Sequence, residues 1–169
     1  MTKAIEFGFC VPIFANPGMA FFRTPCYERL DWPTTKRAVE TCEQLGYDSL
    51  FVADHVFLGR GGAIYEGWTL LSALAGMTER LRLAPIHLCD SFRNPALTAK
   101  MVATLDIVSD GRFILFYDYG WRRAEFDAYG FDFSKDDDER ASRMEEGLTI
   151  IKGMLSEERF SFDGRFYKV

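Results

Sequence analysis

The sequence contains no long apolar run and carries no excess of positive charge. None of its apolar stretches reaches the roughly 18 residues that a membrane-spanning helix requires, and the opening MTKAIEFGF alternates instead of forming the apolar core of a signal peptide. Lys and Arg number 20 against 25 Asp and Glu, which gives a net charge of −5. Nucleic acids and anionic bilayers both attract clustered cations, so we expect a cytoplasmic protein with no nucleic-acid and no membrane partner.

Recognisable metal and disulfide motifs are absent from the sequence as well. Its two histidines, His55 and His87, form neither an H-x-H pair nor an H-E-x-x-H helix, and its four cysteines include no C-x-x-C pair. We therefore predict no metal site. In a cytoplasmic chain the thiols are expected to stay reduced; they belong to Cys10, Cys26, Cys42 and Cys89.

The sequence does contain a repeated alternation of strand and helix patterns. Period-two or continuous apolar runs predict four strands, and each is followed by a segment with the apolar spacing of a helix. Strands that alternate with helices form parallel βαβ units, so we expect an α/β fold in a single domain over residues 1–169. The predicted strands are residues 5–11, 49–53, 81–88 and 112–117, and the predicted helices are residues 31–45, 68–78, 94–109, 125–129 and 136–155.

Local signals add detail to these elements. Pro85 cannot donate a ladder hydrogen bond, so we expect a bulge or break in the third strand. Asp163-Gly164 between two Phe-containing runs predicts a C-terminal β-hairpin with a type I′ turn. Residues 14–32 form a connection long enough to suggest a functional loop. The predicted core stripes of the helices are Ala38, Cys42 and Leu45; Leu97, Met101, Leu105 and Val108; and Met144, Leu148, Ile151 and Leu155.

Polar residues directly after the second and third predicted strands are the first candidates for chemistry. Asp54-His55 follows the second strand, and a histidine can act as an acid or a base near neutral pH. The alternative is a histidine that is held by the loop backbone and oriented by Asp54. Cys89, Asp90 and Ser91 follow the third strand, where they either line a ligand site or only begin a turn.

Four stretches of the chain carry a pattern shared with one protein family. They are YEGWTLLSALAGMTERLRLA at 65–84, FRNPALTAKMVATLDIVSDGRF at 92–113, GWRRAEFDAYGFDF at 120–133 and FSFDGRFYKV at 160–169. Together they resemble the luciferase-like monooxygenase superfamily. The segment CDSFRNP at 89–95 is most similar to the branch that uses a deazaflavin coenzyme.

This resemblance implies that the chain is the N-terminal half of a TIM-type (β/α)₈ barrel, with four parallel βα units and a C-terminal hairpin. It implies FMN or the deazaflavin coenzyme bound at the C-terminal ends of the strands, and a small-molecule substrate that is oxidised by dioxygen or takes part in hydride transfer. By the same resemblance, Asp54 and His55 are the catalytic candidates, and Cys89, Asp90 and Ser91 run beside the cofactor.

Two departures from the family pattern concern the cofactor. Members are roughly twice as long as this chain, and the half that normally supplies much of the phosphate site is not in this sequence. The fourth strand ends in FYDYGW at 116–121 where the family has G-x-G-x-G-W, so Phe116 and Asp118 replace glycines. Glycine permits close approach of the backbone to a ligand, and these replacements oppose normal flavin binding. The predicted cofactor contacts at this strand end are Tyr117, Asp118 and Gly120.

Three functions stay open on the sequence. The first is a flavin- or deazaflavin-dependent oxidoreductase that is active only as a complete barrel. The second is a non-catalytic half-barrel subunit without a cofactor, and the third is an enzyme that uses the Asp-His pair and Asp118 without flavin. Asp118 could equally form a salt bridge with Arg122 or Arg123, and His87 is expected to be a core residue of its strand.

A half-barrel cannot bury all of its own apolar surface. Its first and fourth strands would have unpaired edges, and one apolar face of its sheet would be exposed to water, which soluble monomers avoid. We therefore expect either a homodimer or a second chain that supplies the other four units. The residues predicted on the uncovered face are Phe7, Phe9, Leu50, Val52, Leu83, Ile114 and Phe116.

Overall fold

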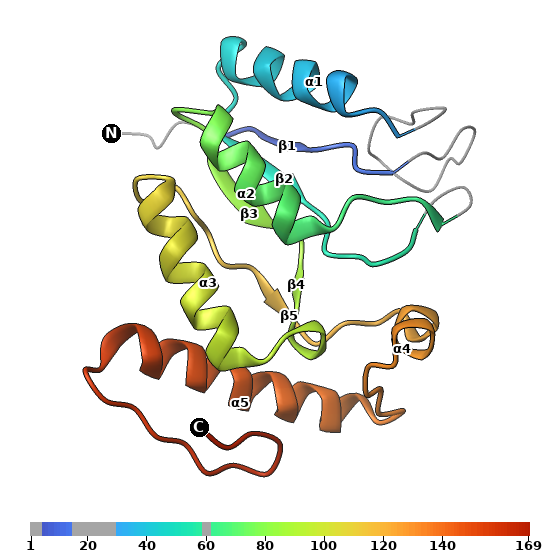
Figure 1. Cartoon of the computed structure of the whole chain (residues 1–169), viewed down its shortest axis with the longest axis vertical. Helices are drawn as coiled ribbons and strands as arrows, with labels where there is room; N and C mark the ends of the chain where they lie inside the picture. The colour runs from blue at the N-terminus through green and yellow to red at the C-terminus, as the bar shows by residue number, and fades with distance from the viewer. Residues whose placement is uncertain (1–4, 15–29, 59–61) are drawn as a thin grey trace.

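The computed structural model describes residues 5–14, 30–58 and 62–169 (Figure 1). Cys26 and most of the predicted functional loop lie outside these ranges. The elements are β1 (Gly8–Cys10), α1 (Trp32–Gln44), β2 (Ser49–Val52), α2 (Gly67–Met77), β3 (Arg82–Pro85), β4 (Leu88–Cys89), a 3₁₀ turn η2 (Asp90–Phe92), α3 (Pro95–Val108), β5 (Tyr117–Asp118), α4 (Arg123–Tyr129) and α5 (Asp137–Ser156).

Parallel strand pairing confirms the predicted α/β class. β1, β2 and β3 form one sheet in chain order, with Phe9 opposite Leu50 and Leu50 opposite Leu83. β4 and β5 form a second parallel pair. A parallel bridge between Leu83 and Phe113 links the two, so the fourth predicted strand pairs in two short parts. In Figure 1 the helices α1, α2, α3 and α5 follow one another from top to bottom in chain order, as successive βα units do.

The predicted break in the third strand is present. Pro85 pairs with Val52 as the last residue of β3, and β4 begins only at Leu88. The peptide bond between Ile86 and His87 is cis. The third predicted strand is therefore divided into β3, which pairs with β2, and β4, which pairs with β5.

The hydrophobic core lies between the first sheet and the helices that cover it, and this corrects the predicted sidedness of the strands. Leu50, Val52 and Leu83 are fully buried together with α1 and α2 residues, and Phe9 packs against the same cluster. They are therefore not on an uncovered face. Because side chains alternate along a strand, the opposite face carries their neighbours in sequence, among them Cys10, Phe51 and Ala84. Ile114 and Phe116, which were also predicted on the uncovered face, are exposed.

The helices begin and end close to the predicted residues, but their buried faces differ from the predicted stripes. Leu45, Leu97, Val108 and Leu155 are exposed. The sequence did not define the buried face of either helix clearly. Apolar residues lie nearly all round α3, and α5 packs against its neighbours partly through glycines. The buried positions are Thr35, Val39 and Cys42 in α1; Pro95, Thr98, Ala99, Val102 and Leu105 in α3; and Gly147, Ile150, Ile151 and Gly153 in α5.

The C-terminal segment folds back on itself, but not at the predicted turn. Phe162 and Val169 exchange two backbone hydrogen bonds, and the amide of Gly164 donates to the carbonyl of Tyr167. The chain therefore reverses at Arg165-Phe166. Asp163 and Gly164 lie in the extended segment before this turn, because Asp163 forms a bridge with Lys168. A type I′ turn requires a positive φ, and Gly164 does not have one.

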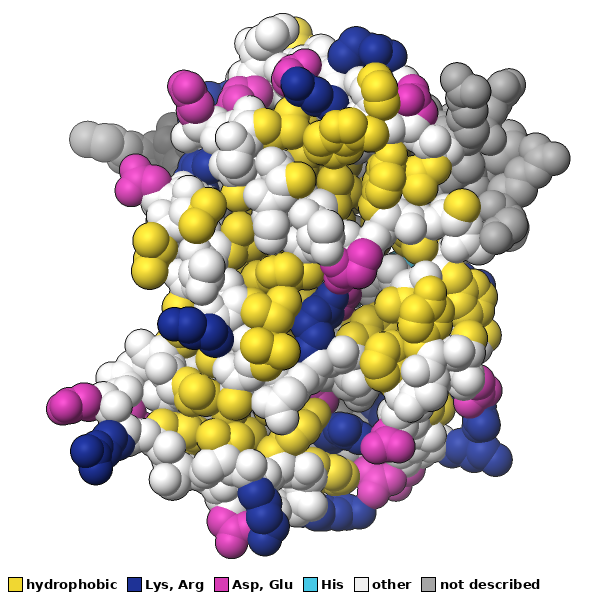
Figure 2. Space-filling model, in the orientation of Figure 1, with side chains coloured by type: hydrophobic (Ala, Val, Ile, Leu, Met, Phe, Trp, Pro, Cys, Tyr) yellow, Lys and Arg dark blue, Asp and Glu magenta, His cyan; other side chains and the backbone are white. Residues whose placement is uncertain are grey.

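No helix within the described ranges is long and apolar enough to cross a membrane. The visible surface in Figure 2 mixes apolar and charged side chains, and hydrophobic ones gather at the right of the view, where α4 lies in Figure 1. An aromatic cluster lies in this region. Its rings belong to Phe92, Phe126, Phe131 and Phe133, with centroids of neighbouring pairs 4.8–6.3 Å apart.

Candidate functional site

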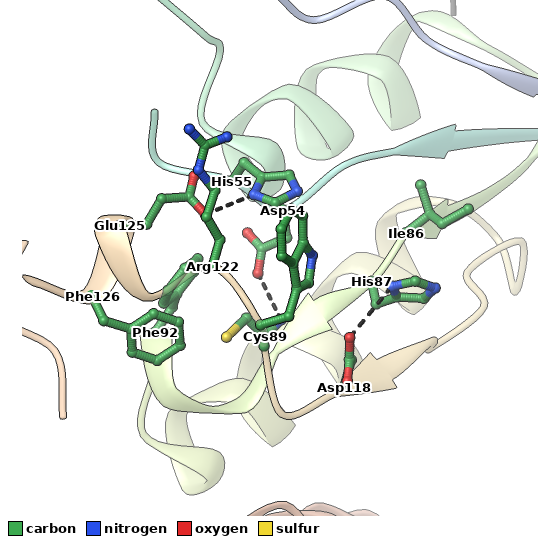
Figure 3. A pocket seen from close by; sticks show the side chains of 12 residues that line it. Asp54, His55, Ile86, His87, Cys89, Phe92, Asp118, Arg122, Glu125 and Phe126 are labelled. Atoms are coloured by element: carbon green, nitrogen blue, oxygen red, sulfur yellow. Dashed lines mark hydrogen bonds and ion pairs between the residues drawn. The ribbon is translucent and has the colours of Figure 1, made fainter. Parts of the chain in front are cut away.

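The candidate site is a cavity of about 120 Å³ at the C-terminal ends of the parallel strands (Figure 3). Residues after β2, on and around β4, and after β5 meet there with the beginning of α4. This is the edge at which parallel α/β sheets and barrels place their ligands. The lining consists of Asp54, His55, Ile86, His87, Cys89, Phe92, Asp118, Gly120, Trp121, Arg122, Glu125 and Phe126.

His55 and Glu125 form a close pair in this cavity. Glu125 Oε2 lies 2.7 Å from His55 Nδ1, and its Oε1 accepts hydrogen bonds from the amides of Val56 and Phe57 at 3.0 and 3.1 Å. The carboxyl group is 1% exposed. Burial alone would raise the pKa of Glu125, but the hydrogen bonds from His55 and the two amides hold that pKa below its ordinary value. Glu125 is therefore an ionised acceptor that fixes the orientation of His55.

α4 is anchored so that Glu125 reaches the end of β2. Phe126, the next residue, is buried, and its ring packs against Phe92 and Phe133. Tyr129 donates a hydrogen bond from its hydroxyl group to the carbonyl oxygen of Val56 at 3.1 Å. The short helix is thus held by Phe126 against the aromatic cluster and by Tyr129 against the loop that carries His55.

Asp54 lines the same cavity but engages a different partner. Its two oxygens bind Arg93 at 2.7 and 2.9 Å, and Oδ2 also accepts from the amide of Cys89 at 2.9 Å. Arg93 in turn binds Glu66 at 2.6 Å. The alternative in which Asp54 orients His55 is wrong, because Glu125 does so. A catalytic role for Asp54 stays a prediction; its contacts tie the end of β2 to the start of η2.

Cys89 and Gly120 form the floor of the cavity. Burial raises the pKa of the Cys89 thiol, and the nearby Asp54 carboxylate raises it further, so the group stays protonated. Gly120 has a φ of +77°, and a Cβ atom there would lie 2.6 Å from Cys89 Sγ and 2.8 Å from the Phe126 ring. The predicted glycine is therefore required by both its backbone conformation and its surroundings.

His87 and Asp118 lie together on the other side of the cavity (Figure 3). The distance between His87 Nδ1 and Asp118 Oδ2 is 3.5 Å, and the His87 and Phe116 ring centroids are 4.2 Å apart. The interpretation of His87 as a core residue is wrong, because its side chain is 39% exposed. Asp118 pairs with His87 and not with the neighbouring arginines: Arg123 binds Asp127, and Arg122 lies over the Phe57 ring.

Three other predicted site residues lie away from this cavity. Tyr117 donates a hydrogen bond to Asp90 at 2.5 Å, beneath α5, and Tyr167 of the C-terminal segment donates to the same carboxylate at 2.8 Å. Burial raises the pKa of Asp90 despite these bonds, and burial next to Asp90 raises the pKa of Tyr167 to about 12. Ser91 lines a separate cavity beside Arg140.

Sequence reasoning missed several residues that the structure brings into the site. All three belong to the GWRRAEFDAYGFDF block, which carried the family resemblance: Glu125, Trp121 and Arg122. Glu125 received no role of its own, Trp121 was expected only to pack on the barrel rim, and Arg122 was considered only as a salt-bridge partner of Asp118. The Trp121 ring stands edge-on to His55, with centroids 6.0 Å apart at 84°. The position of this block could have indicated Glu125. The block follows the fourth predicted strand, and an acidic residue there can reach the end of the second strand.

The cavity fits part of a flavin-type cofactor. Phe92, Trp121 and Phe126 offer apolar walls for a ring system, and His55 offers a polar group at its edge. At about 120 Å³ it is smaller than the roughly 300–1,000 Å³ of a typical ligand pocket. Arg122 is the one cation in its lining among the described residues, where a phosphate would need several donors. Within the same ranges, no group of His, Cys, Asp and Glu side chains is arranged to hold a metal ion.

A cavity at the C-terminal ends of parallel strands places this chain in the class of α/β proteins that bind ligands at one edge of the sheet. A family model described as luciferase-like monooxygenase matches residues 6–169. The chain belongs to this family.

Individual relatives agree with this assignment. The chain is 29% identical to an FMNH(2)-dependent dimethylsulfone monooxygenase from Pseudomonas putida, over 99% of this chain and 46% of that protein. It is 34% identical to an F420-dependent glucose-6-phosphate dehydrogenase from Intrasporangium calvum, over 75% of this chain and 39% of the relative. The fold matches the monooxygenase RslO1 from Streptomyces bottropensis with a TM-score of 0.76 at 22% identity, over 98% of this chain and 47% of that one. The chain thus spans less than half the length of these relatives.

Proposed function

We propose that this chain is the N-terminal half-barrel of an FMN- or deazaflavin-dependent oxidoreductase that acts on a small molecule. The observation that carries the proposal is the His55–Glu125 pair, held at 2.7 Å at the strand ends of a luciferase-like chain. Similar relatives are named for FMN or F420. In this proposal residues 1–169 form one domain that works in the cytoplasm.

His55 is the acid or base of the proposed reaction. The Nδ1–H group of His55 donates a hydrogen bond to the Glu125 carboxylate, so Nε2 of neutral His55 is left as the acceptor that takes a proton from the substrate or returns it. Glu125 stabilises the imidazolium form while the proton is held. Trp121 stands edge-on to the histidine ring and bounds it on one side. Bound cofactor would supply the hydride transfer or the oxygen activation.

The remaining predicted residues take supporting roles. Asp54 positions the strand ends through Arg93 and the Cys89 amide, and Gly120 lets the chain pass close to Cys89. Of the predicted cofactor contacts, the proposal keeps Cys89 and Gly120, because these line the cavity. Asp118 lines it as well, but its negative charge opposes the ring and the phosphate of a flavin, so it is not kept as a cofactor contact. The groups for a cofactor phosphate would come from a second copy or a second chain, since the cavity lacks the cations for it.

The test is a titration of the purified assembly with FMN and with the deazaflavin coenzyme, followed by absorbance. We expect binding of one of them. With reduced FMN, His55→Ala should slow oxygen consumption by roughly a hundredfold or more, the usual contribution of a general acid or base, while the thermal unfolding midpoint changes little. Unaltered turnover in His55→Ala would remove the histidine from the mechanism.

A non-catalytic half-barrel is the second candidate, and one observation favours it. Phe116 and Asp118 stand where the family pattern has glycines, and Phe116 is 44% exposed beside His87. Bulk and negative charge there oppose a flavin ring and its phosphate. If steric exclusion is the cause, the double variant Phe116→Gly, Asp118→Gly should bind FMN more tightly than the natural chain. Absence of binding in both proteins would favour the non-catalytic subunit.

A further inference from the structure

The cavity contains a second His-carboxylate pair with a character unlike that of the first. His55 and Glu125 are close, and Glu125 is almost completely buried. His87 and Asp118 are 3.5 Å apart, with side chains 39% and 29% exposed. An N–H···O hydrogen bond usually measures 2.7–3.2 Å, so the second pair is loose and open to a ligand where the first is closed.

The second pair has hydrogen-bonding capacity to spare. Asp118 Oδ1 accepts from the amide of Tyr119 at 2.7 Å, which fixes the carboxylate and leaves Oδ2 facing His87. Among the described residues, no hydrogen bond reaches His87 Nε2. A carboxylate can only accept, and a neutral imidazole that turns Nδ1–H towards it presents Nε2 as a second acceptor. The two side chains therefore offer acceptor atoms to a ligand that brings donors.

The charge of the cavity also favours a ligand that brings hydrogen-bond donors. Its lining carries the carboxylates of Asp54, Asp118 and Glu125 against the guanidinium group of Arg122. Arg93 neutralises Asp54, which leaves the carboxylates of Glu125 and Asp118. Glu125 is buried and bound to His55 and two backbone amides, so the negative charge that a ligand can reach lies at the His87 side of the cavity, on Asp118. An anionic ligand group would be repelled at this place, whereas a neutral or positively charged donor would be attracted.

We propose that His87 and Asp118 are the substrate-recognition pair of this site, and that they bind a polar group with N–H or O–H donors and no negative charge. The substrate class is thus an alcohol, an amide or an amine, and not a carboxylate or a phosphate at this end. Calling the ligand a substrate rests on the proposed function; the binding preference does not. His55 is left free to exchange a proton with the other end of the same molecule.

The experiment follows the NMR signals of the imidazole rings, because the chain has only two histidines. Protein in its purified assembly, with a histidine-free tag and ¹³C-labelled histidine, gives two ring Cε1 signals per chain, assigned with His87→Gln and His55→Gln. The probes are acetamidinium, acetamide and acetate, which share one shape and differ in charge and donors. We expect the His87 signal to move most readily with acetamidinium, then acetamide, with roughly a fivefold or greater affinity of acetamidinium over acetate.

Asp118→Asn is the decisive variant, because it keeps an oxygen for the Tyr119 amide and removes the charge. It should abolish the preference for acetamidinium over acetamide, while Asp163→Asn, a change at an exposed carboxylate, should leave the preference intact. An unmoved His55 signal shows that the Asp118→Asn site is folded. Equal or tighter binding of acetate by the natural protein would overturn the proposal without reference to any variant.

The flavin titration separates this proposal from the proposed function. Cofactor binding without any donor preference at His87 would remove the recognition pair and leave the oxidoreductase. A donor preference without binding of either cofactor would remove the oxidoreductase and leave a binding site for neutral or cationic small molecules.

Discussion

At the scale of single residues, the site depends on a buried acid that holds a histidine. Ionised Glu125 stabilises the fold above the ordinary glutamate pKa near 4.5, because its folded-state pKa is lowered, and this stabilisation is lost as the pH falls through the lowered value. We expect Glu125→Gln to weaken the dependence of the free energy of unfolding on pH below 4.5. Urea denaturation of both proteins on either side of that pH measures this, and parallel pH profiles would contradict it.

Gly120 offers a second test at this scale. In Gly120→Ala, a positive φ and overlap with Cys89 and Phe126 act together, so we expect a loss of roughly 2–4 kcal/mol in the free energy of unfolding. Gly46→Ala is the matched control: its φ is +84° but no atom lies within 4 Å of the new Cβ, which leaves only about 1–2 kcal/mol of backbone strain. Equal losses in the two variants would show that crowding at the cavity floor is absent.

The sequence could identify His55 but not its partner. A histidine directly after a buried strand is a local signal, and so is the positive-φ glycine before Trp121. Glu125 is 70 residues away in the chain, and only the packing of α4 against the aromatic cluster brings it to His55. The mutual positions of His87 and Asp118 likewise depend on the pairing of β4 with β5, which no local pattern specifies.

At the scale of elements, α5 fixes the C-terminal segment to the body of the fold. Glu146 accepts hydrogen bonds from the amides of Arg165, Phe166 and Tyr167 at 2.8–3.2 Å. Glu146→Gln halves this acceptor capacity, and we expect roughly tenfold faster hydrogen exchange of these amides, since bonds to a charged acceptor are the stronger ones. Glu145→Gln, on the exposed face of the same helix, should leave their exchange unchanged. Similar exchange in all three proteins would show that Glu146 does not hold the turn.

Helix positions were predictable from the sequence, whereas helix faces were not. The caps Asp31, Asn94 and Asp136 and the following prolines or acids mark the helix starts within a residue or two. The buried faces depend on how closely neighbours approach. Gly147 and Gly153 let Asp90 and the Phe160 ring pack against α5, which turns the helix away from the stripe that its larger apolar residues suggest.

At the scale of the whole molecule, helices cover one face of the first sheet, and the opposite side of the strands is exposed only in part, since Ser49 and Ala84 are buried there. The core between the sheet and the helices is complete, with Leu50, Val52 and Leu83 fully buried. The other face retains exposed apolar side chains at Ile114 and Phe116, near the cavity. Soluble proteins seldom leave such a face next to unpaired strand edges uncovered, so we expect the site to work only after other strands close over it.

We propose above all that this chain is a half-barrel that functions inside a larger closed assembly, and light scattering on the purified protein tests this most directly. We expect a mass above the 19.4 kDa of one chain: twice that value for a homodimer, or the sum with a second chain that copurifies. The assembly should also be the form that binds FMN or the deazaflavin coenzyme. A soluble monomer at micromolar concentration that binds the cofactor unaided would contradict the account.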